Sequence, residues 1–182
     1  MTVGRLLAAA ARHLPSARCA AEEGTVTMDV PREDWPAALA FARDTAGCDF
    51  FDWLTAVDEQ DNGLAVVVHL YSIEDQQHLF VRTLVPRDDP VLPTATPVFR
   101  GAAWAERETH EMFGVVFDGH PGLAPLLLPD GFEGHPLRKD FPLAARAAQD
   151  WPGAREPGEG AAPARPRRRM VPPGVPEGWS PP

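Results

Sequence analysis

The tripeptide Gly-His-Pro occurs twice within one short segment, first at residues 119–121 and again at residues 134–136. The charged run Glu106-Arg107-Glu108 precedes both copies, and Arg138-Lys139-Asp140 follows them. Glycine and proline fix the backbone at turns, and so many charges close together are poor material for an apolar core. The segment Glu106–Leu143 therefore favours a surface that holds one shape against a partner.

Length and charge place limits on the rest of the chain. Its 182 residues, 44% of them hydrophobic, suit one domain with a proper core. Residues 1–143 hold 11 Lys and Arg against 22 Asp and Glu, a net charge of −11. Because binding to phosphates needs a basic surface, we expect no nucleic acid as the main partner.

Composition changes after residue 143. Residues 144–182 contain nine prolines and no periodic pattern, which predicts an extended tail beside a domain of residues 1–143. Trp151 and Trp179 are candidates for anchors on another protein, with stray aromatics as the alternative. The basic run Arg165–Arg169 either stays solvated or meets an acidic patch or anionic lipid.

The N-terminus and the cysteines bear on the compartment. Leu6–Ala11 after Arg5 imitates a signal peptide, but the apolar part is short, and we expect an amphipathic helix instead. No run approaches the roughly 18–20 apolar residues that span a bilayer, so we expect a cytosolic protein that meets the membrane only through a partner. Cys19 and Cys48 are expected to be free thiols, too few for an iron–sulfur cluster.

Hydrophobic patterns predict an α+β domain in which a sheet packs against helices. Helices are expected at 3–13, from an N-cap at Asp34 to a stop at Gly47, and at 102–113 with Gly114 at C′. Strands are expected at 25–30, 50–57, 64–73 and 79–85. Short connections between the last three strands, including the turn Asn62-Gly63, predict an antiparallel meander.

Several side chains invite a catalytic or metal-binding interpretation. Glu106 and His110 stand four residues apart on a helix and could share a metal ion, but one pair leaves such a site incomplete. Glu106 and Glu108 point apart on a helix, which does not suit acid and base catalysis on one substrate. His120 and His135 each lie between Gly and Pro, where we expect backbone hydrogen bonds that lock a turn. No nucleophile elbow or phosphate-binding loop is present.

Three motifs in this order resemble one family. They are Glu-Arg-Glu-Thr-His-Glu-Met-Phe-Gly at 106–114, Phe-Asp-Gly-His-Pro at 117–121 and Gly-His-Pro-Leu-Arg-Lys-Asp-Phe-Pro-Leu at 134–143. Together they resemble the 30 kDa subunit, also called the C subunit, of the proton-pumping NADH:quinone oxidoreductase, respiratory complex I. The resemblance covers roughly residues 30–143. The family usually has an aromatic residue and Asp at His110-Glu111, and an Arg pair at Ala124-Pro125.

The resemblance implies a non-catalytic subunit of the peripheral arm, on the cytoplasmic side of a bacterial cell membrane. It implies partners in the large D subunit and the neighbouring B and I subunits, with FMN and iron–sulfur clusters held in other chains and none in this one. The implied interface comprises Glu106, Arg107, Glu108, Phe113, Gly114, His120, Pro121, Gly134, His135, Pro136, Leu137, Arg138, Lys139 and Asp140.

Two alternatives remain open at this point. The same subunit type occurs in related membrane-bound hydrogenases and in quinone-reducing complexes that do not use NADH. A stand-alone metalloenzyme built on Glu106 and His110 is the second alternative.

Overall fold

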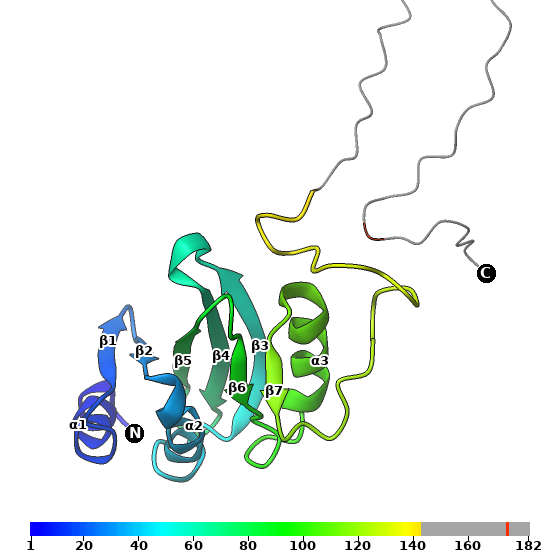
Figure 1. Ribbon diagram of the computed structural model, residues 1–182. Coiled ribbons are helices and arrows are strands. Elements are labelled where there is room, and N and C mark those ends of the chain that lie inside the picture. Colours follow the sequence, from blue (N-terminus) through cyan, green and yellow to red (C-terminus); the bar gives the residue numbers. More distant parts are fainter. Residues whose placement is uncertain (143–173, 175–182) are drawn as a thin grey trace, which may run out of the picture.

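The computed structural model describes residues 1–142 and Gly174, and it shows a main five-stranded sheet with helices against it (Figure 1). In chain order the elements are α1 (Val3–His13), β1 (Arg18–Glu22), β2 (Thr25–Asp29), the 3-10 helix η1 (Arg32–Asp34), α2 (Trp35–Asp44), β3 (Phe50–Asp58), the 3-10 helix η2 (Gln60–Asn62), β4 (Leu64–Ser72), β5 (Gln77–Val85), β6 (Val91–Pro93), α3 (Ala102–Phe113) and β7 (Val116–Asp118). The predicted α+β class is confirmed. The predicted tail, with Trp151, Trp179 and Arg165–Arg169, lies outside the described residues apart from Gly174.

The five main strands are ordered β1-β2-β5-β4-β3. The predicted meander is confirmed, because β4 pairs antiparallel with both β3 and β5, with Val68 opposite Leu54 and Val81. Sequence patterns did not predict β1, nor that β2 pairs parallel with β5, where Val26 lies opposite Leu79. A second, two-stranded parallel sheet joins β6 to β7.

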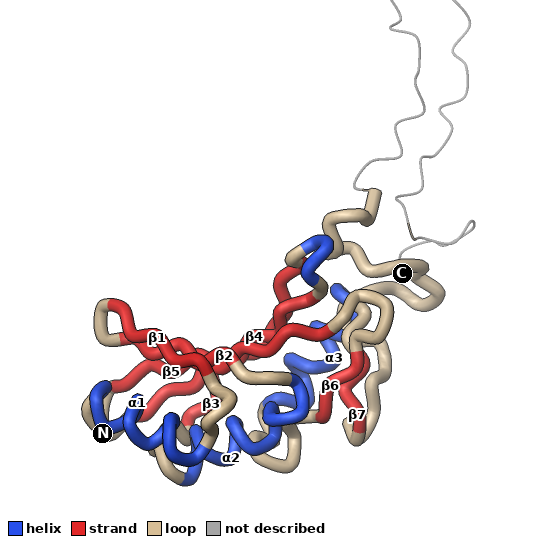
Figure 2. Tube along the Cα trace, turned by 60° about the vertical axis from the view of Figure 1, so that its left-hand side comes forward, coloured by secondary structure: helices blue, strands red, loops and turns tan. Residues whose placement is uncertain are grey.

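The two faces of the sheet differ. Side chains alternate along a strand, and in β4 the residues Leu64, Val66, Val68 and Leu70 are fully buried. In Figure 2 the α-helices lie together on one side of the sheet, and this is the side on which those residues form the core with α1 and α2. On the opposite face the described residues place no helix, and several large apolar side chains are exposed there, among them Trp53, Val57 and Leu84.

The first two helices show which local predictions hold. Leu6, Ala9 and Ala10 of α1 are buried, which confirms the amphipathic helix. Asp34 stands at the N-cap position of α2, as predicted, but its side chain makes no capping hydrogen bond. Its backbone is already helical, and its carboxylate accepts a hydrogen bond from Ser16 Oγ instead. No helix in the described part of the chain combines the length and apolarity needed to span a membrane.

The cysteines are free thiols, as predicted. Cys48 is buried, and burial raises the pKa of its thiol to about 11. Such a thiol is inert as a nucleophile at neutral pH.

Candidate docking site

Helix α3 is the element around which the predicted segment is built. Its buried positions Ala102, Glu106, Thr109 and Phe113 follow helical spacing and face the molecule's interior. Gly114 ends the helix in the left-handed conformation, with φ +77°, and its N–H donates to the His110 carbonyl at 2.8 Å. Gly114 is therefore the predicted C′ residue.

Glu106 ties α3 to the loop after β6. Its side chain is fully buried and accepts hydrogen bonds from Thr94 Oγ1 and from the Ala95 N–H, both at 2.5 Å. Burial raises the pKa of Glu106, and these two hydrogen bonds and nearby His120 oppose the shift. The carboxylate is thus consumed by internal contacts and is not available to a partner.

The first Gly-His-Pro copy closes against the start of α3. His120 Nε2–H donates to the Ala103 carbonyl at 3.1 Å, and the Gly122 N–H donates to His120 Nδ1 at 2.9 Å. These two bonds fix the neutral tautomer with the proton on Nε2. Gly119 has φ +79°, a conformation that favours glycine. The predicted backbone lock at His120 is confirmed.

Two side chains of α3 hold the loop that follows the first copy. The Glu111 carboxylate accepts hydrogen bonds from the N–H groups of residues 126, 127 and 128 at 2.5, 2.9 and 3.4 Å. Arg107 donates to the carbonyls of Ala124 and Pro125 at 2.8 and 2.6 Å. Ala124 and Pro125 therefore contact α3 through their backbone carbonyls.

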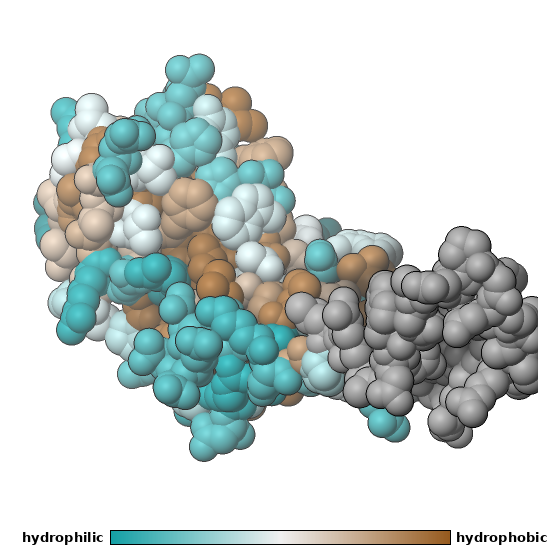
Figure 3. All heavy atoms as spheres, turned by 90° about the horizontal axis from the view of Figure 1, so that it is seen from above, coloured by the Kyte–Doolittle hydropathy of each residue, from teal (hydrophilic) through white to brown (hydrophobic). Residues whose placement is uncertain are grey.

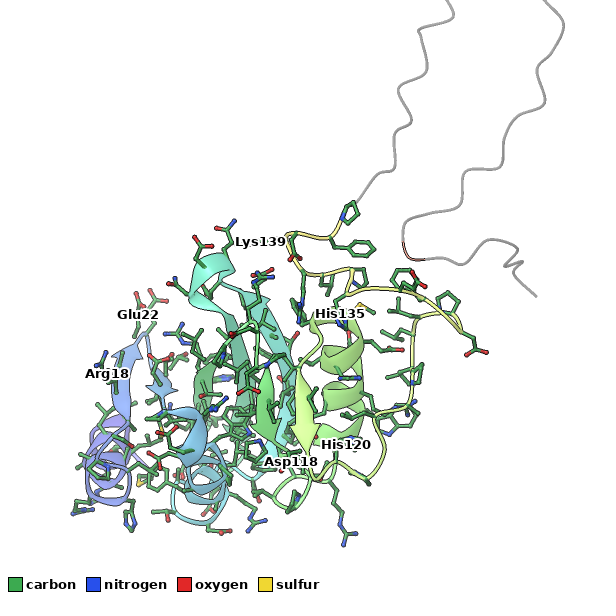
Figure 4. The ribbon with its side chains drawn as sticks, viewed as in Figure 1. Arg18, Glu22, Asp118, His120, His135 and Lys139 are labelled. Carbon is green, nitrogen blue, oxygen red and sulfur yellow. The ribbon has the colours of Figure 1, made fainter. Side chains whose placement is uncertain are left out.

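The second copy closes against the end of α3. His135 Nδ1–H donates to the Glu111 carbonyl at 2.9 Å, and the next two carbonyls, of residues 112 and 113, accept from Leu137 N–H at 3.1 Å and Arg138 Nε at 2.5 Å. Carbonyls in the last turn of a helix have no partner within it, so these contacts satisfy them. The predicted backbone lock at His135 is confirmed. Figure 4 shows His120 and His135 at opposite ends of α3.

A buried carboxylate from the sheet secures the end of this segment. Asp58, at the end of β3, accepts hydrogen bonds from the N–H groups of Lys139 at 2.7 Å and Gln60 at 2.8 Å, and it is paired with Arg87. Arg87 also meets Asp140 at 3.1 Å. Burial alone would raise the pKa of Asp58, but the three donors outweigh it and lower that pKa to about 2.

The metal-binding interpretation of α3 finds no support in this geometry. His110 Nδ1 donates to the Val115 carbonyl at 2.8 Å, whereas Glu106 faces Thr94 and Ala95, so the two side chains are committed to different partners. Within the described residues, no three His, Cys, Asp or Glu side chains are arranged to hold a metal ion.

The pair considered for acid and base catalysis is also separated. Glu106 is buried and Glu108 is exposed, as expected for side chains that point apart.

The remaining predicted interface residues differ in exposure. Glu106, Phe113 and Gly114 are buried, and Arg107, His120, His135, Pro136 and Arg138 are half-buried; the exposed ones are Glu108, Pro121, Gly134, Leu137, Lys139 and Asp140. Apolar side chains are exposed beside them: Trp104 at 63%, Leu127 at 60% and Leu137 at 55%. Figure 3, seen from above, shows hydrophobic residues at the surface among hydrophilic ones. Sequence patterns missed Trp104, which lies on α3, and Leu127, which lies in the loop held by Glu111.

Comparison with known proteins identifies the family. Residues 28–147 match the model of the family described as "Respiratory-chain NADH dehydrogenase, 30 Kd subunit". The chain belongs to this 30 kDa subunit family. It is 41% identical over 133 residues to the C subunit of the NADH-quinone oxidoreductase of Acidithiobacillus ferrooxidans, an alignment that covers 67% of this chain and 65% of that relative. This chain therefore spans less than two thirds of that relative's length.

Two solved structures share the fold of this 30 kDa family member. A trypsin-resistant fragment of Nqo5 aligns with a TM-score of 0.59 and 30% identity, over 67% of this chain and 99% of the fragment. A chain of the membrane-bound sulfane sulfur reductase, an archaeal respiratory membrane complex, aligns with a TM-score of 0.68 and 25% identity, over 78% of this chain and 86% of that one.

Proposed function

We propose that the chain is a non-catalytic peripheral-arm subunit of an NADH:quinone oxidoreductase. Such a complex passes electrons from NADH through FMN and iron–sulfur clusters in other subunits to quinone, coupled to proton translocation. The observation that carries the proposal is the α3 site of a 30 kDa family member, in which Glu106, His110, His120 and His135 are all committed to internal hydrogen bonds. What remains for a partner is shape and exposed side chains.

The proposed docking surface lies on the outer side of α3 and of the two loops that it holds. Trp104, Leu127 and Leu137 supply exposed apolar area, and Lys139 and Asp140 supply charges of both signs beside it. Because backbone hydrogen bonds already order these loops, docking requires little further ordering. The charges would set register more than affinity. The large D subunit, with the B and I subunits nearby, is the proposed partner, on the cytoplasmic side of a bacterial membrane.

Purification under mild conditions tests this function. A tagged chain extracted in gentle detergent should bring down a complex that oxidises NADH and reduces quinone. The untagged chain, purified alone, should contain neither flavin nor iron. Stoichiometric iron in the folded, isolated chain would contradict the proposal.

A pair of matched variants locates the docking surface. Leu137→Ser should lower the yield of the complex at least threefold, because it removes an exposed apolar side chain from the proposed interface. Ile73→Ser serves as the control, since Ile73 is 65% exposed in the turn between β4 and β5, away from α3. Equal yields from both variants would remove the α3 surface from the interface.

A second candidate function is the equivalent subunit of a related complex with a different electron donor or acceptor, such as a membrane-bound hydrogenase. The observation that favours it is the fold shared with the sulfane sulfur reductase chain, which aligns over 78% of this chain with a TM-score of 0.68. The activity of the co-purified complex separates the two. Reduction of quinone by NADH supports the first candidate, and reduction of sulfane sulfur or oxidation of hydrogen without NADH supports the second.

A further inference from the structure

Three side chains form a hydrogen-bonded row on the sheet face opposite α1 and α2, which no helix of residues 1–142 covers. Asp52 Oδ2 lies 2.7 Å from His69 Nδ1, and His69 Nε2 lies 3.0 Å from His78 Nδ1. They come from the neighbouring strands β3, β4 and β5 and have no part in the α3 site. All six histidines of the chain fall within the described residues, and His69 and His78 are the only two within hydrogen-bond distance of each other.

His69 is held in a defined orientation. Its residue is only 7% exposed, and its ring lies 4.6 Å from the ring of Phe80 and 5.7 Å from that of Trp53, centre to centre. An ionised carboxylate only accepts hydrogen bonds, so Asp52 places a proton on His69 Nδ1. In the neutral ring, Nε2 then carries the lone pair and faces His78.

We propose that His69 and His78 form a two-histidine site for a divalent transition-metal ion, with Asp52 as the positioning residue. Two nitrogen ligands at about 2.0–2.1 Å from a tetrahedral Zn²⁺ lie about 3.3 Å from each other. The two imidazole nitrogens here are 3.0 Å apart and share one proton. When a metal ion takes the place of that proton, the proton moves to His78 Nε2 through water and the neutral ring binds the ion through Nδ1. His78 can rotate to allow this, because it is exposed and has no other side-chain hydrogen bond within the described part of the chain.

The surroundings of the pair match what metal-binding histidines need. A ligating histidine almost always donates its other N–H to a carboxylate or carbonyl, which fixes its tautomer and makes it a better ligand. Asp52 occupies that position for His69, and Trp53 and Phe80 form an apolar wall. Water, or a side chain of a protein that covers this face, completes the coordination.

The ligand set defines the class of ion. Imidazole suits Cu²⁺, Ni²⁺ and Zn²⁺, whereas Mg²⁺ prefers oxygen ligands. Structural zinc sites use four protein ligands, so a site with two should bind far more weakly than those sites do. Affinity should follow the order Cu²⁺ above Ni²⁺ and Zn²⁺, with no saturation by Mg²⁺.

Titration calorimetry of the full chain with each metal chloride, in a buffer that does not bind metals, tests the site. The wild-type chain should bind one Zn²⁺, and His78→Gln should weaken binding at least tenfold. His78 is exposed, so this variant should keep the fold, which circular dichroism checks. The matched control is His13→Gln, an exposed histidine on α1, which should bind as the wild type does. Equal isotherms for the wild type and His78→Gln overturn the proposal, as does an equal response to Mg²⁺.

The role of Asp52 has its own readout. Asp52→Asn should lower Zn²⁺ affinity by roughly 10- to 100-fold, the range found for such supporting groups. The melting temperature without metal should stay within about 2 °C of the wild type, because the Asp52 side chain is 46% exposed. Asp52→Glu should recover part of the affinity. An Asp52→Asn chain that binds Zn²⁺ as tightly as the wild type contradicts the positioning role.

Discussion

The two Gly-His-Pro copies contain the same residues but attach to opposite ends of α3 through opposite ring nitrogens. His120 donates from Nε2 to the Ala103 carbonyl near the start of the helix. His135 donates from Nδ1 to the Glu111 carbonyl near its end. A glycine with positive φ precedes each histidine, so the backbone turn is shared and the histidine tautomer is not. The same tripeptide therefore fixes its turn through a different histidine nitrogen in each copy, depending on which helix carbonyl lies within hydrogen-bond distance.

The acids that support the two copies also differ. Glu106, beside the first copy, is fully buried among neutral donors, and burial raises its pKa. Asp58, which anchors the residues after the second copy, faces Arg87 and two backbone N–H groups that lower its pKa to about 2. Both acids are thus buried, but Glu106 faces neutral donors whereas Asp58 faces a guanidinium group, and only the second copy leads to the exposed residues Leu137 and Lys139.

Glu106→Ala should have the largest effect on stability. It removes a fully buried side chain and leaves the Ala95 N–H and the Thr94 hydroxyl without their acceptor. Loss of buried hydrogen bonds together with a new cavity should lower the free energy of unfolding by about 3–5 kcal/mol, measured by urea denaturation.

Glu108→Ala is the matched control, because Glu108 lies on the same helix but is exposed. It should change stability by less than about 0.5 kcal/mol. If both variants lower the free energy of unfolding by similar amounts, Glu106 contributes no more than a surface charge. That result would contradict the structural role of the acid beside the first copy.

Gly114→Ala should disrupt the second copy and spare the first. A Cβ at this position would lie 2.5 Å from His135 Nε2 and 2.7 Å from an Arg138 guanidinium nitrogen, and the φ of +77° adds strain. We expect a loss of about 2–3 kcal/mol. Hydrogen exchange should accelerate at the N–H groups of Leu137 and Arg138 but not at that of Gly122. Uniform acceleration would mean that the copies do not open independently.

Local patterns predicted most of the fold, and they failed where pairing is long-range. The meander of β3, β4 and β5 follows from apolar runs of strand length joined by short turns. The parallel pairing of β2 with β5 depends on strands far apart in sequence, and no local pattern encodes it. The three-residue strands β6 and β7 are too short to give a periodic signal.

The site was predictable in outline and not in its internal contacts. Gly and Pro around His120 and His135 indicated locked turns, which the backbone hydrogen bonds confirm. The burial of Glu106 was missed because it lies in a charged run, although its spacing from Ala102 and Thr109 follows the buried face of the helix. Asp58 lies 81 residues before Lys139, and the sequence carries no signal that joins them.

Asp58→Asn should weaken the second copy in a way that depends on pH. In the folded chain the pKa of Asp58 is about 2, below the ordinary value of about 3.9, so its charge stabilises the fold above about pH 4. This stabilisation is lost as the pH falls through about 2. Asp58→Asn should cost about 2 kcal/mol at pH 7, and thermal melts of the variant and the wild type should converge toward pH 2.

The opposite sign is expected at Glu106. Its raised pKa means that ionisation costs the folded chain stability as the pH rises through that pKa. The stability of Glu106→Gln relative to the wild type should therefore increase as the pH rises, whereas that of Asp58→Asn should decrease. If both variants show the same pH dependence, the two acids do not differ in the way their pKa shifts indicate.

The smallest predicted effect compares the glycines that open the two copies. Both have positive φ, +79° at Gly119 and +94° at Gly134, so alanine should cost about 1 kcal/mol at either position. A Cβ at Gly119 would make an ordinary contact of 3.5 Å with Thr94, whereas at Gly134 it would lie 2.9 Å from the Phe141 ring. Gly134→Ala should therefore lower the free energy of unfolding roughly twice as much as Gly119→Ala, measured by urea denaturation.

Gly122→Ala is the control, because a Cβ there meets nothing within 4 Å and φ is not positive. If Gly119→Ala proves the more costly, the first turn is the less tolerant of the two, because the Phe141 ring can move aside more easily than the backbone at Gly119 can relax.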